Sequence, residues 1–450
     1  MPDPAPGTPA LLAHPARLVV RSFLAAITAG TILLWLPVSS ASGERTDLLD
    51  AAFTATSAVC VTGLSVVSTA EHWSGFGQAV LLGLIEVGGL GFMTLSSLIV
   101  IALSRRLGLR KQLIAHTERG ALNLGDVRSV LIGLGVVTAA VQLGVAVLLA
   151  TRFALGYDQA WGTAVWNGVF HSVSAFNNAG FDLFGSSLIG FSGDALVLVP
   201  VMAAIVIGGL GFPVLIDLRR SGRRIRSLTL HSKVTLATSA ALLVIGFVVL
   251  TAAEWANPAT MGPHGVGRKV LDGAFASVSP RTAGFNSIDV AAMHPESLLA
   301  TIVLMFIGAG SAGTSGGIKV GTFAILALVI WSQLRGEADV RGFRRRIPSS
   351  IQRQATTVAL LAVALVVGAT ALMLYSAEAT LTDAAFEATS AFGTVGLTTG
   401  ITPELPAADR IGLMVLMLVG RVGPITLFTA LVLRSHPSRY RLPEEAPLIG

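Results

Sequence analysis

The sequence is poor in charged residues and almost free of cysteine. Only 12% of its 450 residues are Asp, Glu, Lys or Arg, against about 25% in a typical soluble domain. Its single cysteine, Cys60, excludes an intrachain disulfide. There is no P-loop, Rossmann fingerprint or nucleotide-binding domain, so we expect no ATP hydrolysis by this chain. A metal-ligand His pair, a nucleophile elbow and paired intramembrane carboxylates are also absent, and we therefore predict that it is not an enzyme.

Long apolar runs are abundant instead, with hydrophobic residues making up 53% of the chain. A helix needs about 20 apolar residues to cross the hydrocarbon of a bilayer. Eight runs are long enough: Val19–Val38, Gln78–Leu103, Val130–Thr151, Ala195–Leu218, Val234–Ala253, Leu298–Val329, Thr356–Tyr375 and Ile411–Leu433. These runs predict an all-α polytopic protein with eight transmembrane helices in the cell membrane.

The net charge of +6 is unevenly distributed between the connections. Basic residues concentrate in Arg105–Arg128, Arg219–Lys233 and Arg335–Arg353, whereas the alternate connections are acidic. By the positive-inside rule the basic segments face the cytoplasm. We therefore predict that both termini are cytoplasmic. Topology alone can explain these charges, although a cytoplasmic partner or anionic lipid could use them as well.

The strongest pattern is a fourfold internal repeat. Each copy places an Asp or Asn three residues before a Phe and a Ser four residues after it, in Asp50–Ser57, Asn167–Ser174, Asp272–Ser279 and Asp383–Ser390. Each segment fits a helix that is too short to cross the bilayer. We therefore predict four re-entrant pore helices.

An irregular stretch that ends in glycine follows each of these segments. Unpaired backbone is costly in hydrocarbon and is tolerated where it lines a water-filled path. Glycine adopts positive φ without steric penalty, and inward-pointing carbonyls can replace the hydration shell of a potassium ion. We therefore predict a potassium filter formed by Val61, Thr62, Gly63, Asn178, Ala179, Gly180, Thr282, Ala283, Gly284, Thr394, Val395 and Gly396.

A second glycine cluster follows each loop at a similar distance. The four clusters are Gly88–Phe92, Gly208–Phe212, Gly308–Gly310 and Gly420–Gly423. Close helix packing accounts for much of this pattern. Each unit then reads outer helix, pore helix, loop, inner helix, which predicts four membrane-pore-membrane repeats around one central pore. We expect the repeats at residues 1–110, 111–225, 226–350 and 351–450, the last including a cytoplasmic tail.

The third inner helix is interrupted by a run rich in glycine. Five glycines fall within ten residues, namely Gly308, Gly310, Gly313, Gly316 and Gly317. Since each interior glycine costs about 1 kcal/mol relative to alanine, a helix is disfavoured there. We predict a flexible intramembrane loop that gates the pore beneath the filter. A tightly packed broken helix is the alternative.

Arg421 is the one basic residue deep in an inner helix of the sequence pattern. An arginine inside a membrane is costly and usually faces a cavity or a partner. We interpret Arg421 as part of the gate, where it forms an electrostatic barrier and donates hydrogen bonds to loop carbonyls. A purely structural pairing with a buried acid or carbonyl is the alternative.

These repeats resemble the Trk/Ktr/HKT superfamily of potassium transporters from about Arg17 to Arg434. Asn177–Phe181 and Arg281–Asn286 look like that family's second and third filter loops. The chain is similar to Ktr-type pore subunits, since no extra helix pair precedes the first repeat. Glycine at all four filter positions is similar to potassium-conducting members, and Cys60 departs slightly from the usual small hydroxyl residue.

The resemblance implies potassium uptake by a homodimer with one pore per chain. It also implies a cytoplasmic ring of nucleotide-binding regulatory subunits of the RCK type, so that nucleotides act only through this partner. Sodium would then be an activator. The protein would be surrounded by the lipid bilayer, and we expect no nucleic-acid partner. Two alternatives stay open: a sodium-selective or sodium/potassium-conducting member of the superfamily, and an alternating-access secondary transporter.

Overall fold

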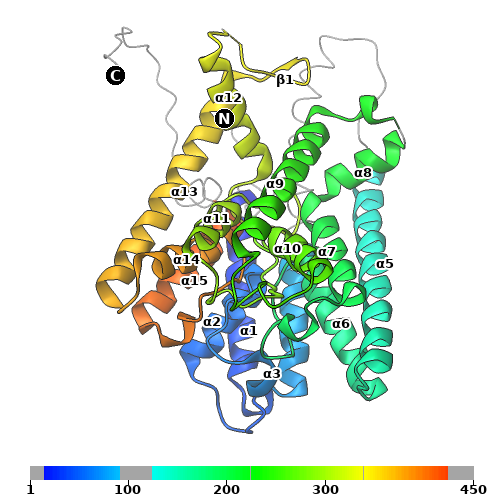
Figure 1. Ribbon diagram of the computed structural model, residues 1–450, viewed down its shortest axis with the longest axis vertical. Coiled ribbons are helices and arrows are strands. Elements are labelled where there is room, and N and C mark those ends of the chain that lie inside the picture. The colour runs from blue at the N-terminus through cyan, green and yellow to red at the C-terminus, as the bar shows by residue number, and fades with distance from the viewer. Residues whose placement is uncertain (1–14, 92–123, 223, 338, 424–450) are drawn as a thin grey trace, which may run out of the picture.

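The computed structural model describes residues 15–91, 124–222, 224–337 and 339–423 (Figure 1). This part of the chain is predominantly helical. The first stretch contains α1 (Pro15–Trp35), α2 (Leu48–Cys60), α3 (Thr69–His72) and the helix Gly75–Gly91. The second contains α5 (Leu124–Gly156), α6 (Trp161–Asn177), α7 (Ala195–Leu210) and α8 (Phe212–Ser221).

The later part of the chain continues the same order of long and short helices. It contains α9 (Leu230–Glu254), α10 (Val266–Val278), α11 (Pro295–Phe306), α12 (Val320–Leu334), α13 (Ser349–Ser376), α14 (Leu381–Gly393) and α15 (Ala407–Val422). A small antiparallel hairpin, β1 (Arg341–Gly342) and β2 (Arg345–Arg346), joins α12 to α13. Short 3-10 turns lie at Pro37–Ser39, Ile189–Phe191, Ile225–Ser227 and Thr402–Glu404.

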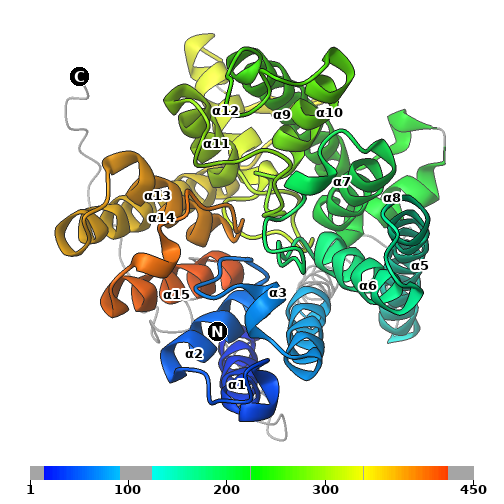
Figure 2. The ribbon, with the colours of Figure 1, turned by 60° about the horizontal axis from the view of Figure 1, so that its bottom comes forward.

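The helices are grouped around a common centre. Figure 2 shows α1 and α2, then α5 to α7, then α9 to α12, and finally α13 to α15 following one another around that centre in chain order. The hairpin lies at the upper end of the molecule in Figure 1. The irregular loops that follow α2, α6, α10 and α14 therefore meet in the middle.

Three of the described helices are long and apolar enough to cross a membrane: Ile132–Gly156 within α5, α9 and α13. Each of these exposes large apolar side chains, for example Leu143, Val244 and Leu360. Such a surface suits contact with lipid. The expected runs Gln78–Leu103 and Ile411–Leu433 lie partly outside the described residues.

The apolar run Ala195–Leu218, expected as one transmembrane helix, is divided into two helices, α7 and α8. The chain turns by 95° between α7 and α8. Gly211, at the turn, has a φ of +89°, and Pro213 follows at the start of α8. A Cβ on Gly211 would lie 2.4 Å from the carbonyl oxygen of Ser311. The bend therefore depends on both the positive φ and the close approach of another segment.

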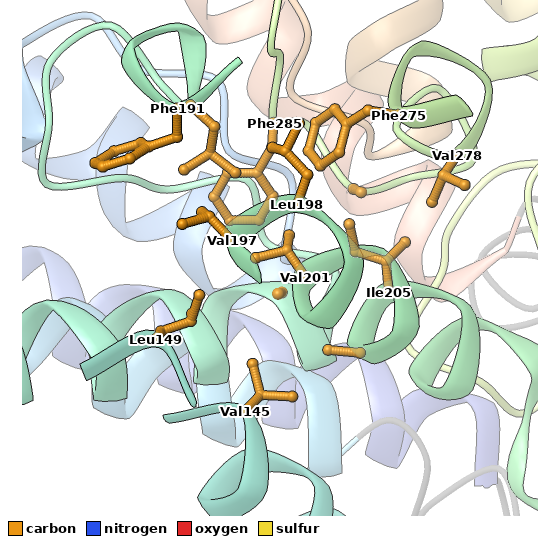
Figure 3. Packing of buried hydrophobic residues seen from close by; sticks show 14 of the residues in the cluster. Val145, Leu149, Phe191, Val197, Leu198, Val201, Ile205, Phe275, Val278 and Phe285 are labelled. Carbon is orange, nitrogen blue, oxygen red and sulfur yellow. The ribbon is translucent and has the colours of Figure 1, made fainter. Parts of the chain in front are cut away.

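A buried apolar cluster packs α5, α7 and α10 together (Figure 3). Val145 and Leu149 of α5 lie against one side of α7, and Phe275 of α10 lies toward its other side. Phe285, which directly follows Gly284, is fully buried in the same cluster. This packing anchors the third irregular loop to the helices around it.

Glycines let three inner helices, Gly75–Gly91, α7 and α15, touch helices that contain the repeated segments through backbone alone. Those partner helices are α2, α6 and α14. A Cβ on Gly88 would lie 2.0 Å from the carbonyl oxygen of Val59, one on Gly208 would lie 1.9 Å from that of Phe176, and one on Gly420 would lie 1.8 Å from that of Phe392. Each carbonyl belongs to the residue six positions after the Phe of the repeat. Three of the four second glycine clusters thus serve close packing of helices, as expected.

We predict that Gly88→Ala, Gly208→Ala and Gly420→Ala each destabilise the protein by about 1–3 kcal/mol or more, because the added methyl group forces backbones apart. Thermal unfolding of the detergent-solubilised protein measures the effect. Gly83→Ala is the matched control, since no atom lies within 4 Å of its Cβ position. Equal melting temperatures for Gly88→Ala and Gly83→Ala would contradict the packing role.

Candidate functional site

Helices α2, α6, α10 and α14 contain the four repeated segments, and three of them end in the same way. The residues after α2, α6 and α14 adopt left-handed conformations, with φ of 56° at Val61, 61° at Asn178 and 50° at Thr394. Each donates its N–H to the carbonyl three residues earlier, and the next residue donates to the carbonyl five residues before itself. This cap ends the helix and turns the chain into the loop. The α10 loop is one residue shorter, and there Thr282 takes the positive φ of 80°.

The four loop glycines form a closed ring. Gly63, Gly180, Gly284 and Gly396 all have positive φ, between 70° and 93°. A Cβ on Gly63 would lie 2.4 Å from the carbonyl oxygen of Ala179, and one on Gly180 would lie 3.0 Å from that of Ala283. A Cβ on Gly284 would lie 2.4 Å from the carbonyl oxygen of Val395. One on Gly396 would lie 2.1 Å from that of Thr62, which closes the ring.

The structure therefore brings the predicted filter residues of all four loops to one place. Every loop presents its glycine to the carbonyl oxygen of its neighbour, so the ring has no room for a side chain at these positions. Thr62, Ala179, Ala283 and Val395 supply those oxygens. Carbonyl oxygens from four sides provide the ligand type that dehydrated potassium ions accept.

The serine of each repeat braces the loop that follows it. Ser57 Oγ accepts a hydrogen bond from the Gly63 N–H at 3.0 Å, and Ser390 Oγ accepts one from the Gly396 N–H at 3.1 Å. In the other two units the hydroxyl donates instead to the carbonyl of the residue after the glycine, Ser174 to Phe181 and Ser279 to Phe285. These serines are markers of the repeat in the sequence, and their spacing of five or six residues before the glycines was the signal for this role.

A cavity of about 390 Å³ adjoins the glycine ring. All four ring glycines contribute to its wall, together with Asp182 and Asp289. Carboxylates at the mouth of a cavity raise the local cation concentration. We call this cavity, which lies next to the ring of carbonyl oxygens, the vestibule.

The glycine run of the third unit lies directly beside the ring. A Cβ on Gly316 would lie 2.1 Å from Thr394 Oγ1, and one on Gly317 would lie 3.2 Å from the Cα atom of Gly393. The run also pairs with the end of α7, since Gly310 and Thr314 donate their N–H groups to the carbonyls of Gly209 and Gly208 at 2.8 and 3.2 Å. The interruption of the helix between α11 and α12 is thus an ordered loop with defined partners.

Arg421 is fully buried and contacts this loop. Its guanidinium donates to the carbonyl of Thr314 and, at 3.0 Å, to the carbonyl of Gly88. The expected hydrogen bond to a loop carbonyl is therefore present. Glu86, a possible buried acid of the first unit, is not the partner of Arg421: it accepts from the amides of Asn177 at 2.6 Å and Gln142 at 2.9 Å.

Two further basic residues, Arg281 and Lys319, bind the same loop. Their role was not predicted from the sequence. Arg281 is 5% exposed and donates to the carbonyl of Gly308 at 3.2 Å. Lys319 donates to the carbonyls of Ser315 and, at 3.3 Å, Gly316. Their positions next to Thr282 and the glycine run were visible in the sequence, but only the fold shows that their donors point at the loop. Three cations thus bind its backbone oxygens.

Comparison with known sequences gives a consistent set of relatives. The TrkH family, described as "Cation transport protein", matches residues 2–440. Ktr system potassium uptake protein B of Bacillus subtilis is 36% identical over 436 residues, covering 97% of both chains. The protein of the same name from Vibrio alginolyticus is 38% identical over 96% of this chain and 94% of its own. Potassium/sodium uptake protein NtpJ of Enterococcus hirae is 37% identical and covers 97% of both chains.

Comparison with solved structures gives the same fold. The crystal structure of the potassium transporter TrkH from Vibrio parahaemolyticus matches with a TM-score of 0.73 and 17% sequence identity. The match covers 95% of this chain and 86% of that one.

Proposed function

Since the chain belongs to the TrkH family of cation transport proteins, we propose that it takes up potassium ions across the cell membrane through the ring of four glycine loops. The family resemblance expected from the filter motifs is confirmed, and the chain is a transport protein and not an enzyme. The observation that carries the proposal is the closed ring, in which Gly63, Gly180, Gly284 and Gly396 each meet a carbonyl of the next loop. The names of its potassium uptake relatives support it.

In this proposal the ring is a selectivity filter. A cation collected beside Asp182 and Asp289 loses water and exchanges it for backbone oxygens. The C-terminal ends of α2, α6 and α14 lead directly into the ring, so their partial negative charge favours the cation. The bracing serines hold the loops at a fixed spacing, which discriminates between ions of different size.

The architecture that suits this function is the fourfold one. We propose four membrane-pore-membrane repeats at residues 1–110, 111–225, 226–350 and 351–450, with eight spans and four re-entrant loops. The grouping of helices around one centre in Figure 2 supports it. We also propose cytoplasmic termini, because the exposed arginines of the β1–β2 hairpin belong to one of the three basic connections.

The loop Gly308–Gly317 is proposed as the gate. It lies against the fourth loop at Gly316 and Gly317. In this proposal, that position is on the path of an ion that leaves the ring. Arg421 and Lys319 bind its carbonyls and place positive charge beneath the filter. Opening requires the loop to release these donors, so the closed state is favoured until a second interaction offsets them.

We further propose that the chain functions as a homodimer controlled by a cytoplasmic nucleotide-binding ring. A constitutively open cation pore would dissipate the membrane potential, and this chain has no nucleotide-binding motif of its own. The β1–β2 hairpin presents Arg344 and Arg345 to solvent and continues directly from α12, the helix that follows the gate loop. A partner bound there can transmit a movement to Gly308–Gly317.

A second candidate function is combined potassium and sodium transport. The similarity to NtpJ, named a potassium/sodium uptake protein, favours it. Sodium would then pass through the same ring or activate potassium uptake. Flux measured separately for the two ions in liposomes that contain only this protein distinguishes these cases.

We predict that Gly63→Ser and Gly284→Ser reduce the preference for potassium over sodium by about tenfold, because a side chain displaces the carbonyl of the neighbouring loop. Growth of a potassium-uptake-deficient strain at low potassium, with sodium added, measures the effect. Gly43→Ser is the matched control, since Gly43 also has positive φ but no atom within 4 Å of its Cβ position. Wild-type growth of the ring variants would show that these glycines do not form the filter.

Removal of the gate should increase ion flux. We expect higher potassium flux and weaker dependence on the regulatory partner after deletion of residues 309–317 or after Arg421→Ala, because the loop loses its place below the filter or its donor. Arg410→Ala is the control, since Arg410 lies in the same helix but binds Asp50 at 2.9 Å. Lower flux from correctly inserted Arg421→Ala protein would assign Arg421 a purely structural role.

Charge reversal on the hairpin tests the docking site. We expect Arg344→Glu, Arg345→Glu and Arg346→Glu together to weaken binding of the regulatory ring in a salt-dependent way, because surface charges speed and stabilise docking. Co-purification at several salt concentrations measures it, and filter selectivity should not change. Since Arg346 binds Asp339 at 2.9 Å, a variant of only Arg344 and Arg345 separates docking from loss of that pair. Undiminished binding would show that these charges only set the orientation of the protein in the membrane.

A further inference from the structure

One position in the pore helices differs chemically among the four units. It is the residue directly after the repeated Phe, and it is Thr54, His171, Ala276 or Glu387. His171 is 1% exposed and Glu387 is fully buried. Two of the four units therefore bury an ionisable side chain directly behind the filter, where burial is costly unless the group is hydrogen-bonded.

His171 holds the outer part of the second loop. Its Nδ1 lies 2.7 Å from the carbonyl oxygen of Asn167 and so carries the proton. Its Nε2 then accepts a hydrogen bond from the Leu183 N–H at 3.3 Å. The ring also stacks on Phe184, with 4.4 Å between centroids and an angle of 18°. Both contacts are made with the two residues directly after Asp182, the carboxylate that lines the vestibule.

Glu387 holds the outer part of the fourth loop in the equivalent way. Its Oε1 accepts from the Thr399 N–H at 3.2 Å and from the Thr398 hydroxyl, and its Oε2 accepts from the Thr402 hydroxyl at 2.9 Å. Thr399 follows Gly396 by three residues, as Leu183 follows Gly180. Two chemically different acceptors thus bind the same backbone N–H of their respective loops. Thr398 and Thr399 also line the vestibule.

The other two units lack this contact. Thr54 Oγ1 has no hydrogen-bond partner among the described residues, and Ala276 has no polar side chain. The third loop is held from outside instead, where the Asn286 N–H donates to Ser187 Oγ at 3.0 Å. Because the glycine ring runs in chain order, the second and fourth loops lie opposite each other.

We propose that His171 and Glu387 are positioning residues that set the filter entrance on two opposite sides and so tune the preference for potassium over sodium. The proposal rests on the proposed filter function. Neither side chain reaches the cavity wall, so each acts through the loop that it binds. The two loops that they hold supply Asp182 and Thr398 to the vestibule, directly beyond Gly180 and Gly396. If either loop shifts beside the vestibule, its ring glycine moves as well. The distances between the carbonyl oxygens around the ring then change.

The test uses the full-length protein reconstituted in liposomes. Radioactive rubidium uptake is measured against competing potassium and sodium, for wild type, His171→Ala and Glu387→Ala. Alanine is compatible with this position of a pore helix, since Ala276 occupies it in the third unit. Thr54→Val is the matched control, because it removes a hydroxyl at the same position that has no partner among the described residues.

We expect each alanine variant to lose about tenfold in potassium-over-sodium preference, since one buried hydrogen-bonding group is left unpaired. Thr54→Val should match wild type. Glu387→Gln and His171→Gln keep an acceptor near the same place and should restore most of the preference. Restoration by glutamine also separates hydrogen bonding from charge, because glutamine carries none.

Three results would overturn the inference. If both alanine variants keep a potassium-over-sodium preference within about twofold of wild type, the loops need no support from His171 and Glu387. Equal losses for Glu387→Gln and Glu387→Ala would assign the effect to charge. Aggregation of both alanine variants in size-exclusion chromatography would assign a role in folding only. If wild type itself carries no potassium or rubidium, the proposed function fails independently of the variants.

Discussion

The arrangement of the whole molecule depends on a backbone contact that excludes side chains. At Gly63, Gly180, Gly284 and Gly396 the carbonyl oxygen of a neighbouring loop lies where a Cβ would stand. Such a ring can close only if four loops come from four directions at equal depth and all with positive φ at the glycine. Because unpaired backbone is costly in hydrocarbon, each loop must also be shielded and braced by its own unit. The order of helices around the centre follows from that requirement.

The bracing uses the same few devices several times. Serines bind each loop from the preceding short helix. Glycines on three inner helices let those helices press against the carbonyls of Val59, Phe176 and Phe392. In a membrane, where apolar surface gains little by burial, such close packing and hydrogen bonding supply the association between helices. Backbone contacts that small residues permit thus add to the apolar packing around the ring.

The third unit departs from this pattern, and the departure places a loop beside the ring. Its inner helix is replaced between α11 and α12 by a glycine-rich segment whose carbonyls accept from Arg281, Lys319 and Arg421. These donors come from the loop after α10, from the start of α12 and from α15. Polar contacts from three elements therefore hold this segment beside the ring.

The helical membrane class, helices α2, α6, α10 and α14 and the glycines at the ends of the loops could be predicted from the sequence, because apolar runs and residue spacing are local properties. The sequence also indicated the family and the break in the third inner helix. It could not show the 95° turn at Gly211, since that bend needs Ser311 to pack where a side chain would stand. Nor could it assign Arg281, Lys319, His171 or Glu387, because their roles depend on which distant carbonyls and N–H groups they face. Local conformation could be predicted from the sequence. The partners of the buried polar groups depend on how the loops meet in the folded protein.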